Sequence, residues 1–115
     1  PAVVADAAGE LGRLLAFAGR IEQAIDLSNQ AIKASPNSPH DFLWFRSKAI
    51  ACFIAGRFAE AATYAADACA RRPDYFFLHY LRAACCQAAG DTVQAQAAFA
   101  EGAELMPRYS ARGLG

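Results

Sequence analysis

The chain has 115 residues, of which 56% are apolar and 19% charged, and its 11 basic and 11 acidic residues leave no net charge. This length supports one domain with its own core, and the apolar content excludes intrinsic disorder. Binding that is driven by phosphate neutralisation needs clustered basic residues. The balanced charge therefore argues against a nucleic-acid partner.

Alanine is by far the most frequent residue type, whereas the β-branched residues Val, Ile and Thr are scarce. Because alanine is the strongest helix former and β-branched residues favour strands, the composition predicts an all-α fold. No apolar run is long enough to span a bilayer and no secretory signal pattern is found, which predicts a cytoplasmic protein without a membrane partner. The chain begins with Pro1 rather than Met, so we expect a fragment of a longer protein.

Helix breakers divide the chain at regular intervals. Apolar-periodic stretches alternate with single glycines and end at prolines, which predicts a helix, a glycine turn, a second helix and a proline stop. The breakers are Gly19, Gly56 and Gly90, and Pro36, Pro73 and Pro107. The predicted helices form three hairpins, over residues 3–18 with 21–34, 39–55 with 58–71, and 75–89 with 92–105.

The glycines and the prolines share the same two intervals, and in both series the first interval is three positions longer than the second. One three-residue insertion explains both measures, and it either lengthens the third helix or loosens the linker at 35–38. Ser38, with Asp41 three residues later, predicts a capped start of the third helix. Asp91 and Gln94 predict the same arrangement for the sixth helix.

Small side chains recur at three shared places when the three units are aligned. Only small residues let two helix axes approach closely, so we expect the helices of each hairpin to cross at these places. They are Gly12, Ala49 and Ala83 in the first helices, Ala24, Ala61 and Ala95 at the start of the second helices, and Ala31, Ala68 and Gly102 further along them.

This pattern resembles the tetratricopeptide repeat family, whose unit is a helix–turn–helix of about 34 residues. The small positions, the glycines, the prolines and the run 56–62 carry the resemblance. It implies an α–α superhelix of three hairpins, or six helices, with repeats at about 5–38, 39–74 and 75–108 and a tail at 109–115. The chain departs from the family pattern at Lys48 and Arg82, where Leu is usual. We expect their aliphatic stems to cover apolar neighbours while their charges reach water.

A narrower resemblance links the runs 35–39, 55–61 and 70–73 to repeat tails of bacterial class III adenylate or guanylate cyclases. Repeat tails of some winged-helix transcription activators look similar. None of the functional residues of a cyclase or a DNA-binding domain lies in this chain. The resemblance therefore concerns only a longer parent protein.

No catalytic pattern accompanies the repeats. The sequence lacks a glycine-rich phosphate loop, a nucleophile elbow and a histidine-containing metal motif, so we expect no enzymatic activity of this chain, no cofactor and no metal. The cysteines lack the spacing of a metal site or a disulfide framework and are expected to be buried small thiols. They are Cys52, Cys69, Cys85 and Cys86.

Binding of a protein or peptide is the expected function. The resemblance implies a concave surface lined by the first helix of each unit. Its candidate lining residues are Arg13 and Phe17, then Leu43, Arg46, Ile50 and Phe53, then Phe77, Tyr80 and Gln87. Because arginine can clamp a carboxylate while aromatic rings supply contact area, this mixture predicts a peptide with apolar anchors and an acidic group. The alternative is an architectural or dimerisation module attached to a cyclase or DNA-binding domain.

The last predicted helix is apolar on its outer side, with Val93, Phe99, Leu105 and Met106. Terminal repeats of such arrays usually present a polar outer face. We therefore expect either a homodimer formed through this helix or a cover supplied by flanking sequence.

Overall fold

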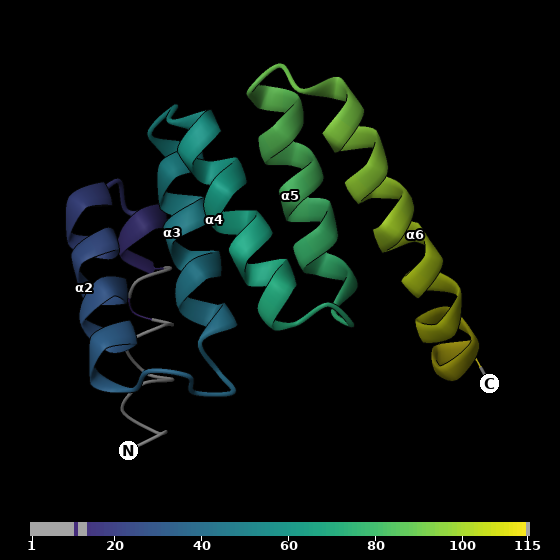
Figure 1. The fold of residues 1–115 in the computed structure, drawn as a ribbon, viewed down its shortest axis with the longest axis horizontal. Helices are drawn as coiled ribbons and strands as arrows, with labels where there is room; N and C mark the ends of the chain where they lie inside the picture. Colours follow the sequence, from purple (N-terminus) through teal and green to yellow (C-terminus); the bar gives the residue numbers. More distant parts are fainter. Residues whose placement is uncertain (1–10, 12–13, 115) are drawn as a thin grey trace.

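A computed structural model describes Leu11 and residues 14–114 of the chain, with side chains up to Met106. Residues 14–17 are helical, and five helices follow: α2 (Ile21–Ala34), α3 (Phe42–Ile54), α4 (Phe58–Arg71), α5 (Phe76–Ala88) and α6 (Thr92–Leu114). They stand side by side in a row that runs from α2 at one end to α6 at the other (Figure 1). The described residues form helices and turns without a strand, which confirms the all-α class.

The turn inside each hairpin depends on its glycine. Gly19, Gly56 and Gly90 have φ values of +81°, +78° and +87°, in the left-handed region that residues with a side chain rarely adopt. At the middle turn the Arg57 amide donates to the Cys52 carbonyl at 2.8 Å, the bond that closes a Schellman motif. The predicted glycine turns are confirmed.

The three-residue insertion lies in a linker. α2 and α4 both have 14 residues, and α3 and α5 both have 13. The linker 35–41 has seven residues, whereas the linker 72–75 has four, and the difference is the insertion. The Ser38 hydroxyl accepts a bond from the His40 amide at 3.2 Å and closes a short turn. α3 therefore begins at Phe42, three residues after the predicted start, and is not lengthened.

Pro107 does not end the last helix, which corrects the prediction. The residues before Pro36 and Pro73, Ser35 and Arg72, leave the helical region with ψ values of 70° and 74°, as steric contact with the proline ring favours. At Pro36 and Pro73 the next helix folds back against the row, and its packing stabilises the turn. Residues 108–114 instead extend α6 away from the row (Figure 1). A helix tolerates such an internal proline at the cost of a hydrogen bond.

The predicted crossing positions lie inside the molecule. Gly12 is outside the described residues, and the other eight are all buried. Four of them have no exposed surface, namely Ala24, Ala49, Ala61 and Ala68. Trp44 and Leu78 are the largest side chains without exposed surface, and they occupy equivalent places in the second and third units. Sequence reasoning overlooked Trp44.

Lys48 corrects the expectation that both departing cations reach water. Only 7% of its surface is exposed, and its Nζ lies 4.2 Å from the centre of the Tyr64 ring and 5.4 Å from that of Phe45. Burial lowers the pKa of Lys48, and the carboxylate of Asp67 opposes this shift. Arg82 is half-buried and donates to Gln94 Oε1 at 2.8 Å. The buried ammonium thus lies over the face of an aromatic ring.

Candidate binding surface

The predicted lining residues are spread over the first helices of the units. Phe17 is 62% exposed, and Arg13 lies outside the described residues. The other candidates lie on α3 and α5, which contact each other in the row. Phe53 on α3 and Phe77 on α5 are 38% and 40% exposed, whereas Arg46 and Tyr80 are half-buried. α3 and α5 thus combine a cation with accessible aromatic surface.

Two α3 candidates contribute less open surface than expected. Ile50 is 9% exposed and packs with Ala16, Ala24 and Ala51, so it belongs to the core between the first two units. Leu43 is half-buried against the cluster around Trp44. Their helical period places both on the predicted lining side of α3, but helices from neighbouring units cover that part of the helix.

Aromatic rings form a continuous path along the first turns of α5. Tyr75 lies 6.0 Å from Phe76 and 5.9 Å from Phe77, measured between ring centres. Phe76 in turn lies 5.9 Å from Tyr80, and Tyr80 lies 5.3 Å from Phe99 on α6. Edge contacts and tilted contacts of this kind are favourable, so the rings hold one another in place across the α5–α6 hairpin.

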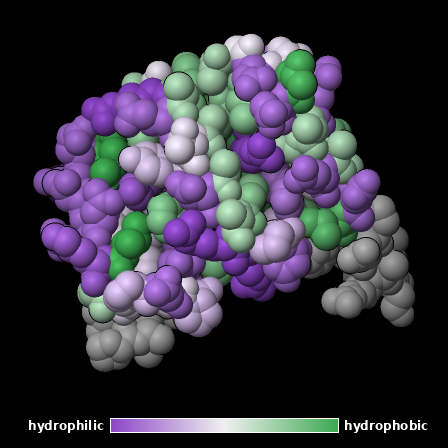
Figure 2. Space-filling model, in the orientation of Figure 1, coloured by the Kyte–Doolittle hydropathy of each residue, from purple (hydrophilic) through white to green (hydrophobic). Residues whose placement is uncertain are grey.

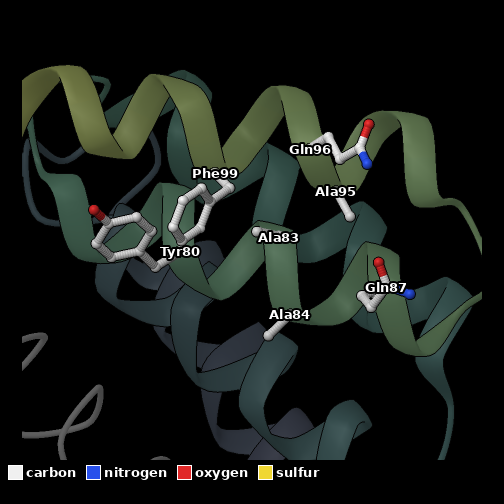
Figure 3. A pocket seen from close by; sticks show the side chains of 7 residues that line it. All are labelled: Tyr80, Ala83, Ala84, Gln87, Ala95, Gln96 and Phe99. Atoms are coloured by element: carbon white, nitrogen blue, oxygen red, sulfur yellow. The ribbon is translucent and has the colours of Figure 1, made fainter.

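A cavity of about 520 Å³ opens between α5 and α6. Tyr80 and Gln87, two of the predicted lining residues, lie on its wall. The remaining lining residues are Ala83, Ala84, Ala95, Gln96 and Phe99. In Figure 3 the rings of Tyr80 and Phe99 lie side by side at one end, and the alanines lie between them and the two glutamines. Sequence reasoning placed Phe99 on an outer face and did not join it to Tyr80.

Charged side chains outside this region form ion pairs within one unit and between two units. Arg71 Nε donates to Asp41 Oδ2 at 3.0 Å, and its guanidinium lies 3.9 Å from the centre of the Phe45 ring. Arg57 pairs with Glu22 and joins α4 to α2. In Figure 2 hydrophilic residues cover most of the visible face, and apolar residues form separate patches among them. The Arg71–Asp41 pair thus lies within the second unit, whereas the Arg57–Glu22 pair connects the second unit to the first.

The four cysteines are buried thiols, as predicted. Burial raises the pKa of Cys85 to about 12 and that of Cys69 to about 11. A nucleophilic cysteine needs a lowered pKa, so these two thiols are unsuited to that chemistry. His79 is buried, with Nε2 2.7 Å from the Pro73 carbonyl oxygen and Nδ1 3.3 Å from Glu101 Oε2.

Metal-binding and membrane-spanning features are both absent from the described residues. They contain no group of three His, Cys, Asp or Glu side chains placed to hold a metal ion. Within the same part of the chain, none of the helices combines the length and apolar character needed to cross a bilayer.

Comparison with known proteins matches no family model and no curated protein. Among solved structures, the fold is similar to that of MamA (MSR-1, C2), a protein with tetratricopeptide repeats, with a TM-score of 0.75, 24% identity and 91% of this chain covered. The chain spans 59% of the length of that MamA chain. These comparisons do not support a nucleotide cyclase as the parent. The chain therefore has a tetratricopeptide-like helical repeat fold, an α–α superhelix of helical hairpins.

Proposed function

We propose that the chain is a protein-interaction module that holds a peptide segment against α3 and α5. The observation that carries this proposal is the exposure of Phe53 and Phe77, at 38% and 40%, on two helices that contact each other. Covering apolar surface releases about 25 cal/mol for each Å² removed from water. A segment with apolar anchors would therefore gain binding free energy at these two rings.

Arg46 favours a peptide ligand that carries an acidic group between its apolar anchors. It precedes Phe53 by seven residues, two helical turns, so both side chains lie on the same side of α3. A guanidinium binds a carboxylate through two parallel hydrogen bonds, which an ammonium or an amide cannot reproduce. The ligand class is thus an acidic peptide segment with apolar side chains on either side of the carboxylate, and the proposed role involves no catalysis by this chain.

Fluorescence anisotropy with two labelled synthetic peptides tests this function. The first carries a Glu between two Leu anchors, and the second carries a Lys in place of the Glu. We expect the first to bind more tightly, R46A to abolish that preference, and the double variant R46A/F53A to weaken binding by about tenfold or more. R20A, at the exposed turn before α2, is the matched control. Equal binding of the two peptides by the wild type would overturn the proposal.

A second candidate function is architectural, and the exposed apolar side chains of α6 favour it. Val93, Phe99 and Met106 are 75%, 60% and 36% exposed, and exposed apolar surface of sufficient extent marks interaction sites. In this role the repeats would dimerise through α6, or would space a catalytic or DNA-binding domain of a longer parent. The double variant F99S/M106S should then lower the mass in sedimentation equilibrium and leave peptide binding unchanged.

The parent protein and its location are proposals of the same kind. A nucleotide cyclase parent rests on the sequence resemblance alone, and the sequence of the full gene product would test it. A cytoplasmic location rests on the lack of a signal pattern, and four free cysteines agree with a reducing compartment. Fractionation of cells that express the tagged gene product would test the location.

A further inference from the structure

The two ends of the row present different apolar surfaces. Near the α2 end of the row, Leu11, Leu14 and Phe17 are 49%, 56% and 62% exposed. At the other end the cavity of about 520 Å³ opens between α5 and α6. Figure 1 shows that the hairpins between these ends are packed side by side.

Inside the row, each unit inserts the same position into the hairpin before it. Leu14, Ala51 and Cys85 are equivalent, because each lies at the same distance along the chain before the glycine of its own hairpin. Ala51 and Cys85 have no exposed surface, whereas Leu14 is 56% exposed. In the first unit, therefore, the side chain at this inserting position is exposed.

The receiving positions are equivalent as well. Cys85 on α5 packs in one cluster with three alanines of the α3–α4 hairpin: Ala49, Ala61 and Ala65. Their counterparts one repeat later are Ala83, Ala95 and Phe99, and all three line the cavity between α5 and α6. The cavity is thus the receiving surface of the third hairpin.

Phe99 replaces a small residue at this surface, but its ring leans on Tyr80, with 5.3 Å between the ring centres. Figure 3 shows Ala83 next to Phe99, and Ala95 further along the wall toward the glutamines. Leu14 is likewise larger than Ala51 and Cys85. The larger side chain of Leu14 therefore matches the open, apolar cavity between α5 and α6.

We propose that copies of this chain associate head to tail, with Leu14 of one copy inserted into the α5–α6 cavity of the next. The contact repeats the interface that already joins successive units of the row. It rests on the architectural function and makes no use of the peptide-binding residues Arg46 and Phe53. Because the two contacting surfaces differ, the contact is heterologous, and repeating it adds further copies instead of closing a two-fold dimer.

Sedimentation equilibrium of the 115-residue chain over a range of concentrations tests this proposal. The mass of the wild type should rise with concentration beyond that of a dimer. L14K and F99K should each stay monomeric, because each blocks one of the two surfaces. An equimolar mixture of the two variants should form dimers, since L14K keeps an intact cavity and F99K keeps an intact Leu14 face.

Leu14 and Phe99 are exposed, so circular dichroism of L14K and F99K should show an unchanged helix content. If the helix content falls, L14S and F99S replace these two variants. A wild type that stays monomeric at every concentration would overturn the proposal. Assembly of L14K to the same mass as the wild type would also overturn the proposal. That result would indicate a face-to-face contact through α6 instead. The peptide assay above gives an independent result, because neither variant changes Arg46 or Phe53.

Discussion

Gly102 on α6 lies directly against the ring of Tyr80 on α5. A methyl group on Gly102 would be 2.7 Å from Cε1 and 2.9 Å from Cδ1 of that ring, and 3.3 Å from Cβ of His79. Replacing a glycine inside a helix by alanine ordinarily adds about 0.5–1 kcal/mol of stability. Here we expect Gly102→Ala to lower the free energy of unfolding by about 1–3 kcal/mol, as overpacking does. Urea denaturation measures the difference.

The double variant separates this steric effect from helix propensity. In a Tyr80→Ala background the ring is gone, so Gly102→Ala should become neutral or stabilising there. If Gly102→Ala stabilises the protein with Tyr80 in place, the close approach of α5 and α6 at this crossing is contradicted.

Ala61 provides a test of the crossings inside the row. It has no exposed surface and packs with Cys85 of the next unit, so Ala61→Leu should cost about 1–3 kcal/mol of stability. Ala95→Leu should cost less, because Ala95 borders the open cavity. Ala59→Leu, on the exposed side of the same helix as Ala61, should be close to neutral in thermal denaturation. Equal losses at Ala61 and Ala59 would contradict the assigned register.

The elements that sequence predicts well here are those with a local physical cause. A glycine at positive φ ends a helix whatever surrounds it, so Gly56 and its equivalents could be placed from spacing alone. Ser38 and Pro107 are ambiguous because a capping residue or a proline acts together with the segment after it. A serine can close a turn ahead of a helix, and a proline can lie within one if the next segment does not fold back.

The candidate surface was harder to predict because exposure depends on neighbours from other units. Helical period places Ile50 and Phe53 on one stripe, yet Ile50 is 9% exposed and Phe53 is 38% exposed. The difference arises because the first unit covers only one of them. The α5–α6 cavity depends on how Phe99 leans on Tyr80, a choice of side-chain conformation that spacing does not encode.

Lys48 and Tyr64 should be energetically coupled. The ammonium lies 4.2 Å from the centre of the ring and is almost fully buried, and cation–π contacts contribute about 0.5–2 kcal/mol. A double-mutant cycle with Lys48→Met and Tyr64→Leu should therefore give a coupling free energy in that range. Tyr64→Phe keeps an aromatic face, so a cycle built with it should give much weaker coupling. A zero value in the first cycle would show that the contact contributes nothing.

The stability of the fold should fall in alkaline solution. The folded protein keeps protons on Cys69 and Cys85 up to pKa values of about 11 and about 12, against an ordinary value of 9.0, whereas the unfolded chain releases them near pH 9. These thiols therefore contribute stability that is complete below pH 9 and is lost as pH rises through the folded values. At pH 10 the loss for both should be about 3 kcal/mol, measured by urea denaturation against the control Cys69→Ala/Cys85→Ala. An equally steep decline in that variant would assign the alkaline instability to other groups.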